Sequence, residues 1–299
     1  MKRIALPKQD FTLSQYAAGF WRLRDWGLSS SELHTFVSTL IDRGVTTMDH
    51  AMVYRSEPIF GELLASDPAL RAKIEIVSKC GIKPPGFGVL GAKETAHYDS
   101  SPEAIIDSVE HSLRALKTEF LDVLLIHRPD YLMDVDATAD VFKKLKTDGK
   151  VKAFGVSNFT VAQFSALNAA CDGGLVTNQV EFSVFESRLL DDGVFEQCQS
   201  TGISPMFWSC LGGGRVAQPN TPSEIALLQK VQVLASKYNA KSPEAILYAW
   251  VSNLPCKPIV LFGSSKLERL LLALEDQDLV LETEDWYALL EIARGEPIP

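Results

Sequence analysis

The 299-residue sequence has few cysteines, no excess of basic residues and no long apolar run. Its five cysteines are widely spread and form no CxxC pair, which argues against a structural metal site or a disulfide framework and predicts reduced, mostly buried thiols. The formal net charge of −9 argues against nonspecific binding of nucleic acid. No apolar stretch is long enough to span a bilayer, and none of secretory length follows Met1. We therefore expect a cytoplasmic protein with neither a membrane nor a nucleic acid as partner.

What is present is the composition of a globular protein, with 46% hydrophobic and 22% charged residues. No linker rich in Pro, Gly or Ser divides the chain, so we expect one domain over residues 1–299. The sequence leaves the oligomeric state open, with a monomer slightly favoured.

Compact apolar runs alternate with helix-start signals along the whole chain. Helices are indicated by the capping box Ser29-x-x-Glu32 and by a capping hydroxyl before proline at Ser101, Thr221 and Ser242. The eight expected strands are Ala17–Trp21, Thr46–Asp49, Ile74–Lys79, Leu121–His127, Ala153–Ser157, Val176–Glu181, Ile203–Trp208 and Ile259–Phe262. This alternation predicts an α/β fold, a (β/α)₈ TIM barrel.

Four polar residues stand at or just beyond the downstream ends of these runs: Asp49, Tyr54, Lys79 and His127. Strand ends of a parallel barrel meet at one face, so these side chains are expected to share a site. A tyrosine has an ordinary pKa of about 10, and a nearby ammonium would favour its charged form. Such a set can protonate a carbonyl oxygen, with Asp49 holding Lys79 and His127 orienting the substrate or the tyrosine.

Reduction of a carbonyl also needs a hydride, which protein side chains do not supply, so a nicotinamide cofactor is implied. Ser157, Asn158 and Gln179 at later strand ends fit its amide, and the face of Trp208 fits its ring. No GxGxxG motif follows a strand and opens a helix, which disfavours a Rossmann domain.

A phosphate-binding segment is indicated at the last strand-to-helix junction. Backbone N–H groups, hydroxyls and cations are available there, as in a pocket for the 2′-phosphate of NADPH. The residues are Gly263, Ser264, Ser265, Lys266 and Arg269.

As a set, these motifs resemble the aldo-keto reductase family over nearly the full length of the chain. The segments that carry the resemblance are Gly44–Tyr54, Ser78-Lys79, Leu125–Asp130, Gly155–Phe159 and Asn178–Glu181. The resemblance implies a catalytic tetrad of Asp49, Tyr54, Lys79 and His127, with Tyr54 as general acid in NADPH-dependent reduction of a small aldehyde or ketone. It also implies that the loop from Trp208 to Gly214, which includes Ser209 and Leu211, approaches the cofactor pyrophosphate. The chain departs from the family at Cys210, where a proline is common, and at Ala273, where many members have an adenine-contacting asparagine.

Two other functions fit parts of the pattern. The same fold can serve as a cofactor-sensing regulatory or binding subunit without turnover. Lys79 can alternatively be read as the Schiff-base nucleophile of a barrel lyase. The sequence favours the reductase because all four chemical residues are present, but it does not identify the physiological carbonyl or the reaction direction.

Overall fold

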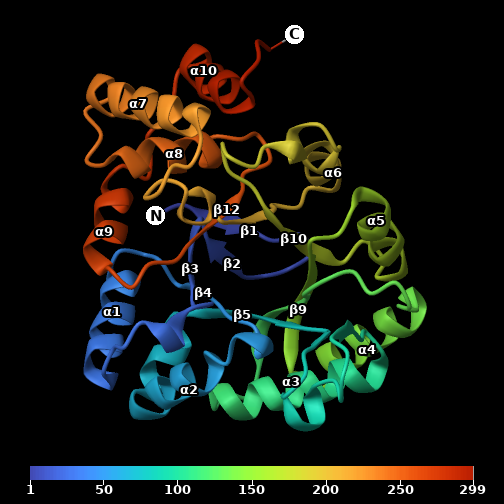
Figure 1. Ribbon diagram of the computed structural model, residues 1–299. Helices are drawn as coiled ribbons and strands as arrows, with labels where there is room; N and C mark the ends of the chain where they lie inside the picture. The colour runs from blue at the N-terminus through green and yellow to red at the C-terminus, as the bar shows by residue number, and fades with distance from the viewer. Residues whose placement is uncertain (299) are drawn as a thin grey trace.

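Eight parallel strands close into a barrel in the computed structural model, which describes residues 1–298 (Figure 1). Neighbouring strands in the barrel follow chain order, and the last pairs with the first, as in a (β/α)₈ barrel. The strands are β3 (Tyr16–Gly19), β4 (Thr47–Asp49), β5 (Glu75–Cys80), β8 (Leu121–Ile126), β9 (Val151–Ser157), β10 (Leu175–Glu181), β11 (Met206–Trp208) and β12 (Ile259–Phe262). The predicted fold class is confirmed.

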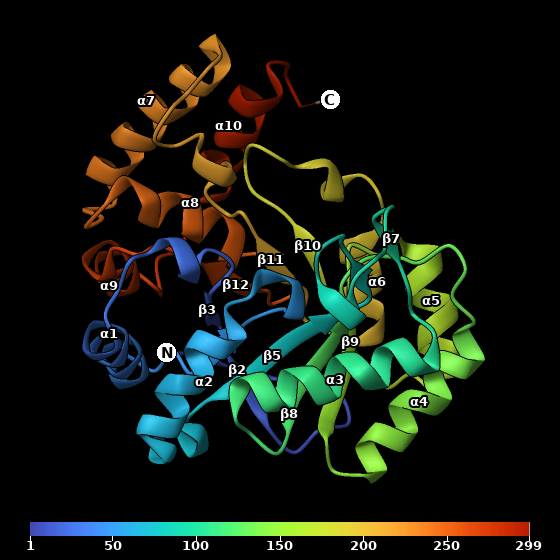
Figure 2. The ribbon, with the colours of Figure 1, turned by 60° about the horizontal axis from the view of Figure 1, so that its bottom comes forward.

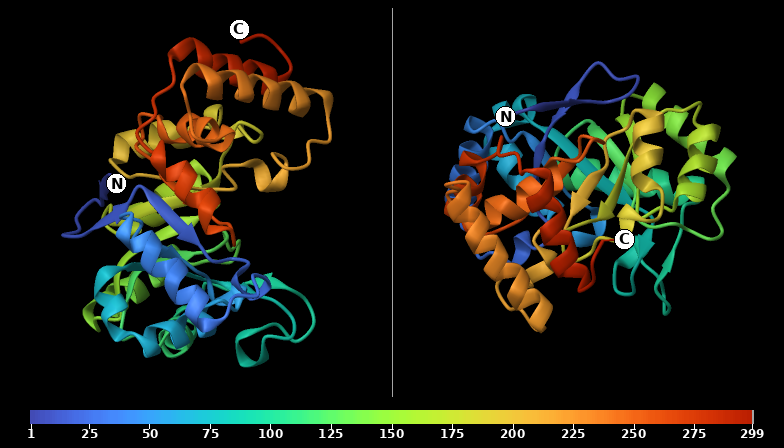
Figure 3. Two further views of the ribbon diagram at one scale, coloured as in Figure 1. Left: turned by 90° about the vertical axis from the view of Figure 1, so that its left-hand side faces the viewer. Right: turned by 90° about the horizontal axis from the view of Figure 1, so that it is seen from above.

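Helices surround the barrel, and all four predicted helix starts are confirmed. Ser29 and Thr221 form complete capping boxes, while Ser101 and Ser242 accept the N–H group three residues ahead. The helices around the barrel are α1 (Ser30–Asp42), α2 (Glu57–Ser66), α3 (Pro102–Leu116), α4 (Val135–Thr147), α5 (Val161–Ala170), α6 (Val194–Thr201), α8 (Pro243–Ser252) and α9 (Leu267–Glu275). Two further helices, α7 (Pro222–Lys237) and α10 (Thr283–Arg294), pack on each other beyond α8 (Figure 3).

Two predicted strands extend beyond the observed ones by more than one residue, each for a local reason. The strand expected from Ile203 begins only at Met206, because the Ile203 N–H group bonds to the carbonyl of Cys198 and closes α6. The first strand ends at Gly19 rather than Trp21, because Phe20 begins a turn in which its carbonyl accepts from Leu23.

Two hairpins were not predicted from the sequence. The first, β1 (Arg3–Ala5) with β2 (Thr12–Ser14), packs Ile4, Leu6 and Leu13 against the apolar residues inside the barrel. It therefore covers the end of the barrel opposite the strand C-termini. The second, β6 (Ile82–Lys83) with β7 (His97–Tyr98), follows directly after β5 and extends past its end (Figure 2).

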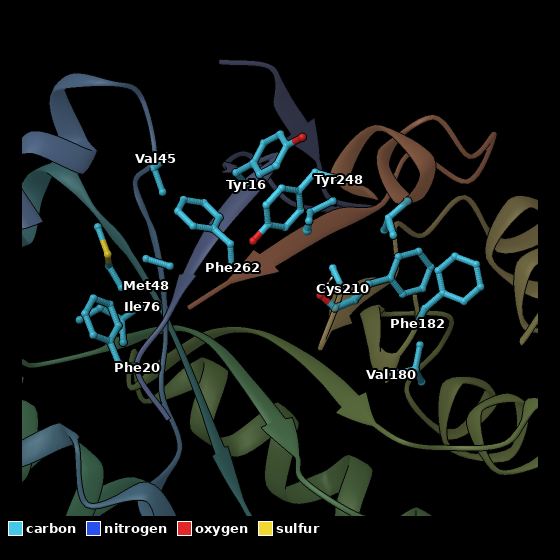
Figure 4. Packing of buried hydrophobic residues seen from close by; sticks show 14 of the residues in the cluster. Tyr16, Phe20, Val45, Met48, Ile76, Val180, Phe182, Cys210, Tyr248 and Phe262 are labelled. Carbon is cyan, nitrogen blue, oxygen red and sulfur yellow. Dashed lines mark hydrogen bonds between the residues drawn. The ribbon is translucent and has the colours of Figure 1, made fainter. Parts of the chain in front are cut away.

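The core has two parts, one inside the barrel and one between the barrel and its helices. Inside, small and branched residues such as Ala17, Val77 and Ile259 fill the narrow space. Outside, larger aromatic rings gather; those of Tyr16 and Tyr248 lie edge to face with centroids 6.0 Å apart, close to Phe262 (Figure 4). Each strand is therefore packed on both faces, which fixes the orientation of the side chains at the strand ends.

All five cysteines are free, as predicted, with Cys171 half-buried and the other four buried. Among residues 1–298, no helix has both the length and the apolar character needed to cross a membrane.

Replacing Gly61 by alanine should destabilise the fold by about 2 kcal/mol. A Cβ atom there would lie 2.0 Å from the Ala115 carbonyl oxygen on α3. Overpacking costs about 1–3 kcal/mol or more, which outweighs the gain of about 1 kcal/mol for alanine over glycine in a helix. Urea denaturation measures the free energy of unfolding. Glu62→Ala, on the exposed side of the same helix, is the control and should stay within about 0.5 kcal/mol of wild type; equal stability of Gly61→Ala would contradict the expected clash.

Candidate active site

Four of the predicted residues meet at the C-terminal end of the barrel. Asp49 is the last residue of β4, Lys79 is the next-to-last residue of β5, and His127 directly follows β8. Tyr54 ends the short 3₁₀ turn Met52–Tyr54 after β4, and Arg55 then adopts a left-handed conformation before α2 begins. The structure thus brings together side chains that are up to 78 positions apart in the sequence, from Asp49 to His127.

Lys79 and Asp49 form a buried ion pair. The Lys79 Nζ atom lies 2.7 Å from Asp49 Oδ2 and 2.8 Å from Oδ1, with side-chain exposures of 0% and 4%. Its third hydrogen goes to the carbonyl of His50 at 2.8 Å. Gln179 Nε2 donates to Asp49 Oδ1 at 2.8 Å. Every ammonium hydrogen therefore has an acceptor, which is the condition for keeping such a charge buried.

Lys79 remains an ammonium group in this environment. Burial acts to lower its pKa, but the charge of Asp49 and the contact with Tyr54 act against it, and the net pKa is raised. A Schiff-base nucleophile needs a neutral amine. The lyase hypothesis therefore has no support from the electrostatics of the site.

Tyr54 lies between Lys79 and His127. The Lys79 Nζ atom is 4.9 Å from the centroid of the Tyr54 ring, and Tyr54 Oη is 3.3 Å from His127 Nε2. Burial raises the pKa of Tyr54, and the lowering influence of Lys79 does not overcome it. The sequence predicted that Lys79 would lower the pKa of Tyr54, and it does act in that direction, but the effect of burial is larger.

His127 is neutral. Burial, together with Lys79 and Arg128, lowers its pKa well below the usual value of 6.5. A neutral imidazole either donates or accepts at Nε2, so His127 can exchange a hydrogen bond with the phenol without adding a charge. The site therefore presents a neutral phenol and a neutral imidazole beside a paired ammonium.

The predicted amide-binding residues adjoin this set through their hydrogen bonds. Asn158 Nδ2 donates to Ser157 Oγ at 2.8 Å and to the His127 carbonyl at 3.3 Å, and Ser157 Oγ donates to the Gln179 carbonyl at 2.8 Å. Within residues 1–298, the side-chain oxygens of Asn158 and Gln179 accept no hydrogen bond from the protein. These two acceptors suit the NH₂ group of a carboxamide.

The loop after β11 continues the same rim of the barrel. Trp208 is the last residue of β11, and Trp208, Ser209 and Leu211 are all half-buried. Ser209 adopts a left-handed conformation with φ of 56°, and its carbonyl accepts from Gly212 at 2.7 Å. Cys210, by contrast, points away into the core and is 2% exposed. The half-buried residues therefore face the barrel mouth, and the buried Cys210 holds the loop against the core.

The predicted phosphate-binding residues lie between β12 and α9. Ser264 Oγ accepts from the Lys266 N–H group at 3.0 Å, and α9 starts at Leu267 with Lys266 as its N-cap. Lys266 and Arg269 are exposed, and neither forms a salt bridge within the described part of the chain. Gly263 and Ser265 are exposed beside them. Two available cations at a helix N-terminus fit a phosphate.

The sequence reasoning missed three residues around Tyr54. Trp21 is 60% exposed, and its ring centroid lies 6.4 Å from that of Tyr54. His50 and Glu57 are fully buried behind the site. The position of Trp21 at the downstream end of the first predicted strand was a usable signal, whereas nothing in the sequence distinguishes a buried glutamate from a surface one. Residues 1–298 contain no group of three or more His, Cys, Asp or Glu side chains arranged to hold a metal ion.

Comparison with known proteins places this site in a family. Residues 17–294 match the family model described as "Aldo/keto reductase family". The chain is 43% identical to oxidoreductase YdhF of Escherichia coli and 36% identical to a 6-dehydroglucose reductase of Agrobacterium fabrum, each alignment covering 100% of both chains. Among solved structures, it resembles the glycerol dehydrogenase AKR11B4 from Gluconobacter oxydans with a TM-score of 0.84 and 28% identity, over 99% of this chain and 97% of the other.

Removal of one partner from the buried ion pair should be more damaging than removal of both. Lys79→Met leaves the Asp49 carboxylate buried without a cation, and we expect a loss of about 3–5 kcal/mol. The double variant Asp49→Asn with Lys79→Met contains no buried charge and should recover part of that loss. Urea denaturation of the four proteins in the cycle gives the coupling free energy.

The matched control for this cycle is the exposed pair of Lys144 and Asp148, one helical turn apart on α4. Lys144→Met should cost less than about 1 kcal/mol, because solvent screens exposed pairs. Equal losses at Lys79 and Lys144 would show that the buried pair has no special place in the stability of the barrel.

Proposed function

The chain belongs to the aldo/keto reductase family, and we propose that it is an NADPH-dependent enzyme that reduces aldehydes or ketones to alcohols. One observation carries the proposal: the Tyr54 side chain lies between a buried, paired ammonium group and a neutral imidazole at the barrel mouth. A protonated phenol in that position is a proton donor whose conjugate base has a cation beside it.

In this proposal Tyr54 is the general acid. Its raised pKa keeps the phenol protonated across the neutral range, so a proton is available for transfer to the substrate. As the proton moves to the carbonyl oxygen, negative charge develops on Tyr54 Oη, and Lys79 stabilises that charge more than it stabilises the neutral phenol. Tyr54 then regains a proton from solvent, and the carbonyl has become a hydroxyl group.

His127 and Asp49 support this step in different ways. His127, neutral and within hydrogen-bond distance of Tyr54, orients the carbonyl oxygen toward the phenol. Asp49 holds Lys79 in place and keeps it charged. Neither group has to change its charge during the reaction.

The residues at the barrel mouth fit a nicotinamide cofactor. The free side-chain oxygens of Asn158 and Gln179 would accept from its carboxamide, with Ser157 holding Asn158 in position. Trp208, Ser209 and Leu211 would border the ring and the pyrophosphate, while the segment Gly263–Lys266 and Arg269 would hold the 2′-phosphate. When bound, such a cofactor supplies the hydride that the carbonyl carbon accepts.

The Tyr54→Phe variant tests the role of the phenol. Loss of a general acid reduces turnover by about 10²–10⁴-fold, and we expect this loss in kcat for NADPH-dependent reduction. NADPH affinity, measured by fluorescence titration, should change little because Tyr54 is not among the proposed cofactor ligands. The substrate panel should include a sugar aldehyde, because relatives include 6-dehydroglucose reductases.

Tyr98→Phe on the exposed β7 hairpin is the control for that variant and should keep wild-type turnover. Tight NADPH binding with negligible turnover that Tyr54→Phe leaves unchanged would instead support a cofactor-sensing binding subunit. No NADPH binding at all would remove the basis of both functions.

Lys266→Ala and Arg269→Ala should each weaken NADPH binding by about tenfold, because each removes a charge-assisted contact to the 2′-phosphate. NADH lacks that phosphate, so its affinity should stay the same. Dissociation constants for both cofactors in each variant give the comparison. Lys257→Ala, an exposed lysine before β12, is the control. A parallel loss for NADH and NADPH would contradict a 2′-phosphate site.

A further inference from the structure

Glu57 is a buried carboxyl group that the proposed mechanism does not use. It is the first residue of α2, three positions after Tyr54, and its side chain is inaccessible to solvent. Its hydrogen-bond partners are serine hydroxyls rather than a cation. Burial of a carboxyl group without a paired cation is destabilising, and the favourable interaction of an acid with the start of a helix offsets only part of that cost. The presence of an acid therefore calls for another explanation.

The two hydroxyls connect Glu57 to the strand that carries Lys79. Glu57 Oε1 accepts from Ser78 Oγ at 2.5 Å, and Oε2 accepts from Ser112 Oγ on α3 at 3.1 Å. Ser78 directly precedes Lys79 on β5, and neighbouring residues of a strand point to opposite faces. Ser78 therefore faces the helices at the point where Lys79 faces the active site.

Close packing of α2 on α3 keeps Glu57 in this position. Gly61 lies one turn after Glu57 on the same face of α2, and Ala115 lies one turn after Ser112 on α3. The approach at Gly61 is so close that it excludes even a Cβ atom, so α2 lies directly against α3. Within residues 1–298, the two residues between Tyr54 and α2 make no hydrogen bond to β5: Ser56 makes no helix cap, and its hydroxyl pairs with His50 Nδ1 at 3.1 Å.

We propose that Glu57 is a positioning residue for Tyr54: its carboxylate fastens the start of α2 to Ser78 and Ser112, which keeps the phenol beside Lys79 and His127. This inference rests on the carbonyl reduction proposed above. A carboxylate accepts from both hydroxyls through charge-assisted hydrogen bonds, whereas the protonated acid accepts from one hydroxyl and donates to the other through weaker neutral ones. The anchor is therefore stronger in the charged form.

The charge of Glu57 changes in the neutral range. Burial raises its pKa to about 7, while hydrogen bonds from Ser78 and Ser112 and the charge of Lys79 act in the opposite direction. Lys79 on β5 is the charged group that influences the pKa of Glu57, and the group that faces Glu57 from α3 is the uncharged hydroxyl of Ser112. Neither histidine behind or within the site titrates near this pH, since the pKa of His50 is lowered to about 3 and that of His127 also lies well below 6.5. Positioning should thus improve as the pH rises through about 7.

The pH profile of kcat for reduction, with NADPH and carbonyl saturating, tests the proposal. Wild type should gain activity between about pH 6 and about pH 8. Glu57→Gln should show no such inflection, because an amide does not titrate yet can accept from one serine and donate to the other. Glu62→Gln, on the exposed face of α2, should retain the wild-type profile.

Glu57→Ala separates positioning from charge. It removes both hydrogen bonds and should lower kcat by about 10-fold to 100-fold, with the KM for the carbonyl and the affinity for NADPH nearly unchanged. Glu57→Gln should recover part of this loss and give a kcat close to that of wild type at low pH, because the amide and the protonated acid each accept one hydrogen bond and donate another. If Glu57→Ala does not unfold cooperatively, Ser112→Ala takes its place; it should lower kcat and move the inflection to higher pH, because loss of a donor raises the pKa of Glu57 further.

Infrared spectroscopy of the protein without cofactor provides a readout that does not depend on turnover. A buried carboxylic-acid C=O band should disappear between about pH 6 and about pH 8 in wild type and Glu62→Gln, and it should be missing from Glu57→Gln. Folded Glu57→Ala or Ser112→Ala with wild-type kcat, a pH inflection that persists in Glu57→Gln, or absence of the band from wild type would each overturn the inference. A wild-type protein that reduces no carbonyl would instead refute the proposed function.

Discussion

The buried ion pair between Lys79 and Asp49 is the interaction on which the rest of the site depends. Two charges removed from water are tolerated only when they are paired and all their hydrogen bonds are made. Here the ammonium group reaches both carboxylate oxygens and the His50 carbonyl, and Gln179 adds a further donor to the carboxylate. Strands β4, β5 and β10 are thereby joined at the mouth of the barrel by one charged network.

That network also determines how the neighbouring groups are protonated. A cation already paired with Asp49 gives Tyr54 a favourable field without drawing its proton away, because burial of the phenol outweighs the effect of Lys79. The same cation adds to the effect of burial on His127 and keeps the imidazole neutral. The result is a protonated phenol beside a neutral hydrogen-bonding partner, which is the combination that the proposed reduction of a carbonyl uses.

Packing on both faces of the barrel strands makes this arrangement rigid. Branched and small residues fill the inside of the barrel, and aromatic and aliphatic residues fill the layer beneath the helices, so strands cannot rotate to turn their end residues elsewhere. The proposed recognition residues lie at the strand ends and on the loops above, as Trp208 and Lys266 do, where half-buried or exposed side chains can meet a ligand. In the proposed reaction, the catalytic groups thus lie on the strands and the turns directly attached to them, and the loops add to cofactor recognition.

The order of strands and helices could be predicted from the residues alone, because burial on both faces leaves continuous apolar runs and helix starts need particular capping groups, as at Ser29 and Thr221. The sequence also indicated which polar residues would meet, since all the strand ends of a parallel barrel open on one side. It could not show that burial would keep the pKa of Tyr54 high, that the short hairpin before Tyr16 would cover the far end of the barrel, or that Glu57 would be buried. Those outcomes depend on desolvation and on distances between residues remote in sequence, such as Glu57 and Ser112, and only the packed tertiary structure decides them.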